Sequence, residues 1–275
     1  MEVLWGDIKP NNIYNVDCYE AIKKIPDNSV DLIYIDIPYD LEGNGGGGAF
    51  GSKKRDYHKE YEKVSQNTKA SSLAKRKCSS SSIAEIAFGI DWDILDEFIR
   101  IQKNINIYIW CSKKQILHLM KFFIEEHDCF FDILVWCKSN PIPTCNNTYL
   151  SDLEYCLHFR NGVSVGGTYE TKSKYYVSPL NKGDKDLYNH PTIKPLELVK
   201  NHIINSSKEG DVVLDCFLGS GTTAVACQQL NRKYIGFELN PEYFAIAQDR
   251  LNGITQIERK QKDAGIMDIF DFMEE

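Results

Sequence analysis

Short apolar runs and amphipathic segments alternate along most of the chain. The near-continuous β-branched run at 30–35 is typical of a strand buried on both faces of a sheet. Similar runs predict strands at 13–16, 105–110, 130–136, 154–159, 211–214 and 234–237, and helical spacing predicts helices at 19–25, 93–103, 114–126, 195–207, 221–230 and 241–251. This alternation indicates the α/β class, with a mostly parallel seven-stranded sheet and helices on both of its faces.

Two polar segments interrupt this pattern. Residues 40–82 lack clear periodicity and contain four consecutive glycines at 45–48. A structureless segment of this length is typically functional or disordered, so we expect a single domain over 1–275 with a long insertion at about 40–90. Residues 161–189 are also polar and turn-rich.

Composition favours one globular domain without a membrane span. Apolar residues make up 43% and charged residues 26% of the 275 residues, which is enough for a large core. No apolar run approaches the roughly 18 residues of a spanning helix, and the acidic N-terminus lacks the apolar core of a signal peptide. The nine cysteines are scattered without zinc spacing. We therefore expect buried, reduced cysteines, no metal site and a cytoplasmic location.

The charge is divided along the chain. The formal net charge of −7 argues against nucleic-acid binding, but residues 52–77 hold nine Lys/Arg against three acidic residues. Residues 263–275 hold five acidic residues and no basic ones, and we interpret them as an acidic tail. The basic stretch is either a solvated loop or a phosphate contact.

A glycine-rich turn follows the predicted strand at 211–214. The segment from Asp215 to Thr223 reads DCFLGSGTT, and Glu238 follows Gly219 after nineteen residues, where a carboxylate can bind ribose hydroxyls. The same pattern fits the dinucleotide fingerprint of nicotinamide enzymes. Asp215 favours another ligand, because a carboxylate at the strand tip repels a pyrophosphate but suits the ammonium or sulfonium group of S-adenosylmethionine.

A second strand tip carries Asp36-Ile37-Pro38-Tyr39. An exocyclic amino group of a base is a poor nucleophile because its lone pair is conjugated with the ring. Two acceptors directed at its hydrogens, the Asp36 carboxylate and the Ile37 carbonyl, would free that lone pair. Tyr39 offers a face for stacking an extruded base.

With these motifs, the sequence resembles the β group of DNA amino-methyltransferases. In that family a catalytic Asp-Pro-Pro-Tyr motif precedes the loop Asp-Pro-Phe-x-Gly-x-Gly-Thr-Thr, and residues 190–195 match its His-Pro-Thr-x-Lys-Pro segment. The resemblance implies a Rossmann-like methyltransferase domain with circularly permuted motif order and S-adenosylmethionine as cofactor. Segments 136–143 and 154–155 resemble family segments near the target base.

The resemblance also implies residue roles. Thr192 and Lys194 would meet the methionine carboxylate of the donor, and Asp17 would read its adenine amino group. The full set of expected cofactor-binding residues is Asp17, Cys18, Asp36, Thr192, Lys194, Asp215, Phe217, Gly219, Ser220, Gly221, Thr222, Thr223 and Glu238. The expected catalytic residues are Asp36, Ile37, Pro38 and Tyr39.

Two departures from the family motifs and the choice of target base shape the functional prediction. Ile37 replaces the first proline of the family motif, and Cys216 replaces the proline of the donor loop. A leading aspartate is commoner in enzymes that methylate N6 of adenine than N4 of cytosine, so we expect N6-adenine methylation of DNA by direct in-line transfer to a flipped-out base. N4-cytosine methylation remains the alternative.

We assign target recognition to residues at about 160–190 and to the basic stretch at 52–77, where lysines would bind phosphates. The candidate DNA-binding residues are Lys53, Lys54, Arg55, Asn140, Lys172 and Lys174, while Tyr175 and Tyr176 fit base reading and core packing equally. Double-stranded DNA is the expected partner. A homodimer and a cognate restriction endonuclease are further candidate partners, in keeping with the family.

Two hypotheses from other classes stay open. A non-catalytic DNA-binding subunit would account for Ile37 and the basic stretch, and it predicts salt-dependent DNA binding without methyl transfer. A nicotinamide oxidoreductase rests on the glycine pattern alone. Calorimetry with dinucleotide and with methyl donor separates the latter from the methyltransferase.

Overall fold

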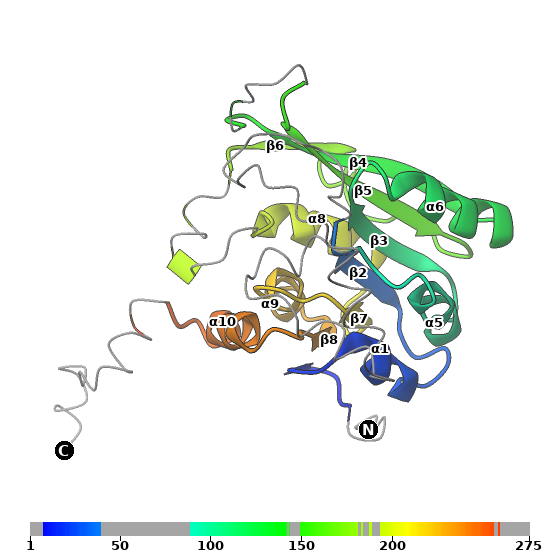
Figure 1. Ribbon diagram of the computed structural model, residues 1–275, viewed down its shortest axis with the longest axis horizontal. Coiled ribbons are helices and arrows are strands. Elements are labelled where there is room, and N and C mark those ends of the chain that lie inside the picture. Colours follow the sequence, from blue (N-terminus) through cyan, green and yellow to red (C-terminus); the bar gives the residue numbers. More distant parts are fainter. Residues whose placement is uncertain are drawn as a thin grey trace, which may run out of the picture.

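One eight-stranded sheet forms the centre of the computed structural model, which describes residues 8–39, 89–141, 143, 149–180, 183, 187–188, 193–255 and 258. The strands are β1 (Asn12–Tyr14), β2 (Leu32–Asp36), β3 (Asn106–Cys111), β4 (Phe130–Lys138), β5 (Leu153–Arg160), β6 (Tyr175–Ser178), β7 (Val212–Asp215) and β8 (Lys233–Phe237). Their order in the sheet is β1-β8-β7-β2-β3-β5-β4-β6. Figure 1 shows the sheet running from β6 at the top to β1 near the bottom.

The sheet is mostly parallel, as predicted, but it has eight strands and not seven. Neighbours from β1 to β3 pair in parallel, β5 is antiparallel to both β3 and β4, and β6 is parallel to β4. The extra strand, β6, lies inside the segment that we interpreted as turn-rich. It has only four residues and alternates between exposed and half-buried positions at the sheet edge, so its apolar signal is weak.

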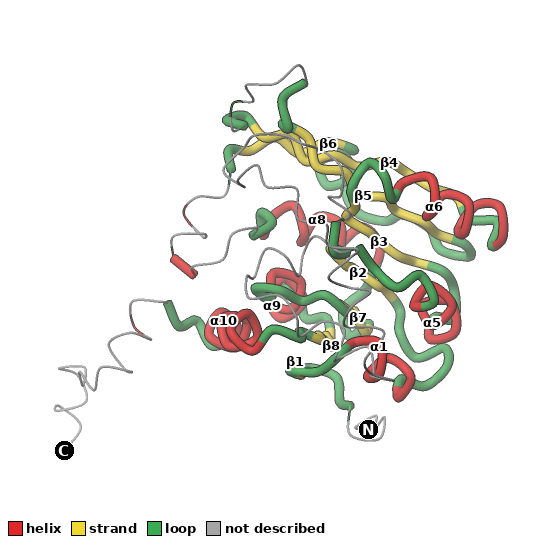
Figure 2. The backbone as a smooth tube through the Cα atoms, viewed as in Figure 1, coloured by secondary structure: helices red, strands yellow, loops and turns green. Residues whose placement is uncertain are grey.

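Helices cover both faces of the sheet, which confirms the prediction. On one side lie α1 (Cys18–Ala21), the 3₁₀ turn η1 (Ile22–Lys24), α5 (Ile94–Ile101), α6 (Ile116–Met120) and the π-helical turn η2 (Lys121–Glu126) that continues it. On the other side lie α8 (Leu196–Ser206), α9 (Thr222–Gln229) and α10 (Pro241–Leu251). Figure 2 shows these two helical layers in red on either side of the yellow strands.

Alternate residues of the central strands face the two layers. Ile33 and Ile35 of β2 belong to the core cluster under α5, whereas Leu32 and Tyr34 belong to the cluster under α8. This double-sided burial explains the near-continuous apolar run. Fully burying each such side chain contributes about 1.5–3 kcal/mol.

The cysteines and the helices of the described residues bear on two further predictions. All seven of its cysteines are free, and six of them are buried, as predicted. None of its helices has the length and apolarity that crossing a membrane requires. Residues 40–88 and 261–275, with the proposed insertion and acidic tail, lie outside the described residues.

Candidate active site

The two predicted strand tips lie side by side. β2 and β7 are neighbouring parallel strands, with Ile33 opposite Leu214, so Asp36 and Asp215 both emerge at the carboxyl edge of the sheet. Burial raises the pKa of Asp215 to about 7, and the charges of Asp36 and Glu238 add to this rise. The structure therefore brings the two carboxylates into one electrostatic site.

Asp36 presents one occupied and one unoccupied oxygen. Its Oδ2 accepts a hydrogen bond from Lys194 Nζ at 2.5 Å. Its Oδ1 is buried and has no hydrogen-bond partner among the described residues. The Tyr39 hydroxyl lies near enough to influence the carboxylate but outside hydrogen-bonding geometry. Burial raises the pKa of Asp36, Lys194 opposes this shift, and Glu154 adds to it.

The backbone after Asp36 is held from β3 and the turn behind it. The Ile37 amide donates to the Trp110 carbonyl at 3.2 Å, which a proline at this position could not do. The Ile37 side chain is 1% exposed and packs in the core cluster below the sheet edge. Gln115 Nε2 donates to the Pro38 carbonyl at 2.9 Å. These interactions replace the rigidity that a second proline would supply.

Lys194 lies inside a row of alternating charges. Its Nζ contacts Asp36 Oδ2 at 2.5 Å and Glu154 Oε2 at 2.9 Å, and Glu154 Oε1 contacts Lys138 Nζ at 2.7 Å. The same ammonium lies 4.9 Å from the ring centre of Trp110 and 5.9 Å from that of Tyr39. Burial opposes ionisation of Glu154, but Lys194 and Lys138 outweigh it and lower its pKa to about 2. Glu154 therefore stays ionised at neutral pH.

The glycine loop approaches α10 closely. Gly219 and Gly221 have φ angles of 54° and 82°, in the left-handed region that favours glycine. A Cβ on Gly221 would lie 2.9 Å from the Cβ of Ala247. Glu238 Oε2 accepts from the Gly219 amide at 2.7 Å, which fixes the loop against the end of β8.

Arg250 holds the same loop from the last turn of α10. Its NH1 group donates to the Ser220 carbonyl at 2.8 Å and to the hydroxyls of Ser220 and Thr222, both at 2.9 Å. Its guanidinium also lies 4.9 Å from the ring centre of Tyr188. Sequence analysis missed Arg250, because a cation in the last turn of an amphipathic helix is usually a solvated residue.

The remaining predicted donor residues surround this loop. Asp17 is buried and caps α1 by accepting from the Tyr19 amide at 3.0 Å, with Cys18 buried behind it. The Val16 amide donates to the Glu238 carbonyl at 3.1 Å, so Asp17 lies next to the end of β8. Asp215 Oδ1 accepts from the Phe217 amide at 3.0 Å, and Thr223 is buried at the start of α9. Thr192 lies outside the described residues.

The predicted DNA-binding residues do not converge at one place in the described structure. Lys53, Lys54 and Arg55 lie outside the described residues. Asn140 is exposed and accepts from the Leu180 amide at 2.6 Å, Lys172 is exposed, and Lys174 pairs with Asp132 at 2.5 Å. Asn140 thereby joins the end of β4 to the end of β6.

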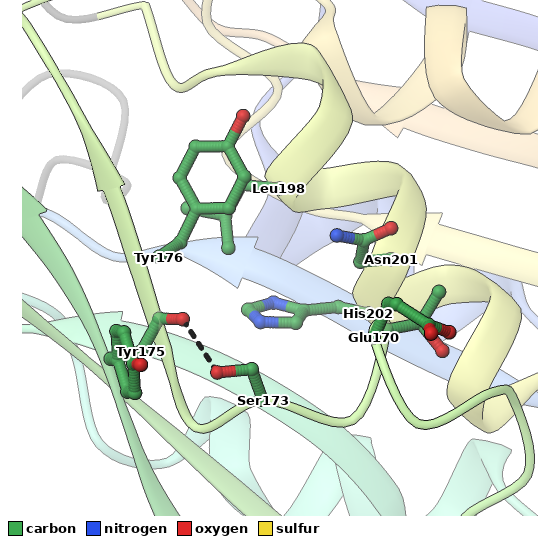
Figure 3. A pocket seen from close by; sticks show the side chains of 8 residues that line it. Glu170, Ser173, Tyr175, Tyr176, Leu198, Asn201 and His202 are labelled. Atoms are coloured by element: carbon green, nitrogen blue, oxygen red, sulfur yellow. Dashed lines mark hydrogen bonds between the residues drawn. The ribbon is translucent and has the colours of Figure 1, made fainter.

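Tyr175 and Tyr176 differ in burial, which separates the two interpretations, base reading and core packing. Tyr175 is 64% exposed, whereas Tyr176 is half-buried and packs against the core cluster under α8. A small cavity lies between α8 and residues 170–176, where Figure 3 shows the Tyr176 ring beside Leu198 and above His202. No predicted catalytic or cofactor-binding residue lines this cavity, so it is separate from the carboxylate edge.

The carboxylate edge fits a cationic ligand. The charges of Asp36 and Glu238 both disfavour ionisation of Asp215 there, and Lys194 pairs with Asp36. A bound positive charge would relieve this repulsion. The sulfonium and amino groups of S-adenosylmethionine carry such charge. No group of three or more metal-ligating side chains occurs among the described residues.

Comparisons with known proteins identify relatives of this chain. The model of the DNA methylase family matches residues 30–249. The chain is 26% identical to the type II methyltransferase M2.MboI of Moraxella bovis, over 94% of each protein. It is 28% identical to M2.DpnII of Streptococcus pneumoniae, over 86% of this chain and 87% of that protein.

Two solved structures share the fold. The M1.HpyAVI–SAM complex has a TM-score of 0.55 and 26% identity, covering 87% of this chain and 99% of that one. The PvuII DNA methyltransferase, described as cytosine-N4-specific, has a TM-score of 0.63 and 18% identity, covering 94% of each chain. The second likeness concerns the fold alone.

Proposed function

Because this chain belongs to the DNA methylase family, we propose that it transfers a methyl group from S-adenosylmethionine to N6 of adenine in DNA. The family depends on S-adenosylmethionine as methyl donor. The observation that carries the proposal is the pair of adjacent strand ends, which places Asp36 and Asp215 at one edge of the sheet. One carboxylate would serve the base and the other the donor.

The donor side of the site would be built from β7, β8 and the start of α1. When bound, the cofactor supplies an electrophilic methyl group on a positively charged sulfur. Asp215 would face its positive charge, Glu238 its ribose and Asp17 its adenine. The left-handed Gly219 and Gly221 let the loop backbone approach a ligand without a Cβ in the way. The resemblance assigns the donor's carboxylate to Thr192 and Lys194.

The base side would be built from β2. Asp36 Oδ1 is a buried acceptor that has no partner among the described residues, and the Ile37 carbonyl is the second acceptor of the same motif. By accepting hydrogen bonds from the two amino hydrogens, they would draw the nitrogen toward tetrahedral geometry and free its lone pair from conjugation with the ring, which makes the nitrogen nucleophilic. Tyr39, half-buried beside Lys194, would stack on a base swung out of the duplex. As the methyl group passes in line from sulfur to nitrogen, the demethylated donor would be the leaving group, and the nitrogen would lose one proton to Asp36 or to water.

The choice of adenine over cytosine rests on the leading aspartate of the motif. Either amino group presents two hydrogens to the same two acceptors, so the chemistry derived above serves both. N4 of cytosine is therefore the alternative target, and the base is an outcome of the test.

The test uses the full chain, DNA and a donor with a labelled methyl group, followed by digestion and identification of the labelled base. Label in N6-methyladenine supports the proposal, and label in N4-methylcytosine supports the alternative. DNA binding without transfer under any condition would support a non-catalytic subunit and overturn the proposal. Asp36→Ala should abolish transfer while donor binding measured by calorimetry persists.

Target recognition and assembly are further parts of the proposal. Residues at about 160–190, including exposed Lys172, together with Lys53, Lys54, Arg55 and Asn140, would contact the DNA. Lys174 would contribute after leaving Asp132. A homodimer, a cognate restriction endonuclease and a cytoplasmic location stay predictions.

A further inference from the structure

We propose that Lys194 is a positioning residue for Asp36, and that Glu154 anchors Lys194 in this role. The inference rests on the proposed function, since Asp36 matters here as the acceptor for the target amino group. It goes beyond the resemblance, which assigns Lys194 to the donor's carboxylate and gives Glu154 no defined role.

The row of charges crosses four neighbouring strands at one edge of the sheet. Asp36 ends β2, Glu154 lies at the start of the antiparallel β5 and Lys138 ends β4. Lys194 enters from the segment before α8, and β3 supplies the Trp110 ring beneath its ammonium at 4.9 Å. The lysine is therefore held by a carboxylate on each side and an aromatic ring below.

This arrangement fixes the orientation of the Asp36 carboxylate. Lys194 binds Oδ2, which leaves Oδ1 as the buried oxygen without a partner among the described residues. A carboxylate held at one oxygen cannot rotate freely about its Cβ–Cγ bond, so the other oxygen keeps one direction. Pre-oriented acceptors of this kind are what in-line transfer requires.

Glu154 keeps the lysine in place. The Lys194 side chain is only 9% exposed, and a buried ammonium with a single partner is costly. Glu154 supplies the second partner at 2.9 Å and is itself held by Lys138 at 2.7 Å. The ion pairs thus connect the end of β4, in a segment that resembles the family's target-base region, to the catalytic aspartate.

Asp132 provides a matched control on the same two strands. It is also a carboxylate between two cations, Arg160 at 2.7 Å and Lys174 at 2.5 Å, and its side chain is 20% exposed, as is that of Glu154. Its two ion-pair partners both lie outside the row formed by Asp36, Lys194, Glu154 and Lys138. Asp132→Asn therefore removes one carboxylate charge with its two ion pairs, as Glu154→Gln does, without touching that row.

The test compares Lys194→Met, Lys194→Arg, Glu154→Gln and Asp132→Asn with the wild type. Lys194→Met should lower kcat by about 100-fold, the size expected for a misplaced reacting group. Lys194→Arg should recover part of this loss because a cation again binds Oδ2. The affinity for S-adenosylmethionine, measured by calorimetry, should change little in Glu154→Gln and Asp132→Asn, whose side chains are not assigned to the donor.

The pH profile gives a readout that a general loss of stability would not produce. Among the described residues, the charged and titratable groups that face Asp36 are Lys194, Glu154, Tyr39, Asp215, Cys111 and Cys156. Removing the Lys194 charge raises the pKa of Asp36, so the acid limb of kcat moves to higher pH. Removing the Glu154 charge lowers the pKa of Asp36, so the acid limb moves to lower pH. Asp132→Asn should leave the acid limb where it is.

Failure of this inference can be told from failure of the proposed function. If the wild type transfers methyl groups but Lys194→Met only weakens donor binding, with an unmoved acid limb, the role implied by the resemblance stands and ours is wrong. If the wild type transfers nothing, the proposed function fails. Carboxyl-carbon NMR of donor-free protein then still tests the ion pair, because Asp36 must titrate at higher pH in Lys194→Met.

Discussion

Ile37 shows how a single residue can replace the stiffness of a proline by other interactions. Its amide extends the β2–β3 ladder by donating to the Trp110 carbonyl, and its side chain fills the core below the motif. A proline would lose the hydrogen bond and most of the buried branched side chain. The isoleucine in this chain is thus supported by its surroundings.

Ile37→Pro should therefore destabilise the protein even though proline is usual in the family motif. We expect the free energy of unfolding to fall by about 2–5 kcal/mol, the range for truncating a buried aliphatic side chain. The measurement is urea unfolding followed by circular dichroism. Ile37→Val keeps the amide and most of the packing, and should cost about 0.5–1.5 kcal/mol. A proline variant as stable as the valine variant would contradict this account.

Asp215 predicts a pH dependence of stability in the donor-free protein. Burial raises its folded-state pKa to about 7, above the value near 4 of an unfolded chain. A raised folded pKa gives stability that is present below pH 4 and lost as the pH rises to 7, by about 4 kcal/mol for a shift of about three units.

Buried His158 and His202 act in the opposite direction, because burial lowers the pKa of each to about 3. The comparison must therefore be between the wild type and Asp215→Asn, in which both histidines remain. From pH 4 to pH 7 the wild type should lose unfolding free energy relative to this variant, because the amide that replaces the carboxyl group has no charge to bury. A difference between the two proteins that is constant over this range would show that the Asp215 pKa is ordinary.

At the scale of elements, a strand could be predicted from the sequence when it is buried on both faces, and not when it depends on pairing with a strand distant in the chain. β2 and β3 are buried on both faces, so their apolar runs were enough to predict them. β6 has four residues that alternate between exposed and half-buried positions, and it depends on pairing with β4, some 40 residues earlier, which no local pattern records. The helix predicted at 114–126 begins at Ile116 and continues as a π-helical turn, a change of hydrogen bonding that spacing alone does not reveal.

The same contrast applies to the site, where motifs predict some residues and only the structure shows others. The tips Asp36 and Asp215 could be predicted because motifs at the ends of parallel strands meet at one edge. The ion pair of Lys194 with Glu154 joins residues 40 positions apart in the chain, and the hydrogen bond of Arg250 with Ser220 joins residues 30 positions apart. Side-chain interactions of this kind depend on the final packing of elements, so they emerged only from the structure.

Helix α10 should control the shape of the donor loop through Arg250. Arg250→Met removes the donor for the Ser220 carbonyl and for two hydroxyls, which leaves the glycine loop less ordered before binding. We expect the Kd for S-adenosylmethionine to rise about tenfold, equal to about 1.4 kcal/mol. Calorimetry gives the Kd, and faster amide hydrogen exchange at 217–223 gives the loop order.

Arg232 offers the control for that experiment. It is half-buried and donates to Ser207, which follows α8, and to Leu230, which follows α9. The three hydrogen bonds, of 2.7 to 3.1 Å, go to the two backbone carbonyls and the Ser207 hydroxyl. Arg232→Met should reduce the stability of the protein without changing its affinity for S-adenosylmethionine. Equal losses of affinity in the two variants would mean that Arg250 acts only through general stability.

On the scale of the whole molecule, a chain with a net charge of −7 must bring DNA to an edge of the sheet where carboxylates gather, among them Asp36, Asp215 and Glu238. The basic stretch at 52–77, with nine Lys/Arg, is the segment whose charge suits this task. Each lysine or arginine that binds a phosphate releases a counterion and steepens the salt dependence of binding.

Neutralising Lys53, Lys54 and Arg55 together should therefore flatten that dependence. Replacing all three by alanine should reduce the slope of log K against log salt by about 2.7, at about 0.9 for each phosphate that is no longer neutralised. Lys103 and Lys208 precede β3 and β7, at the opposite edge of the sheet, and their alanine variants should leave the slope unchanged. Fluorescence anisotropy with a labelled duplex measures both. A triple variant with the wild-type slope would assign phosphate binding to other residues, and Lys172 would then be the next cation to test because it is exposed in the described structure.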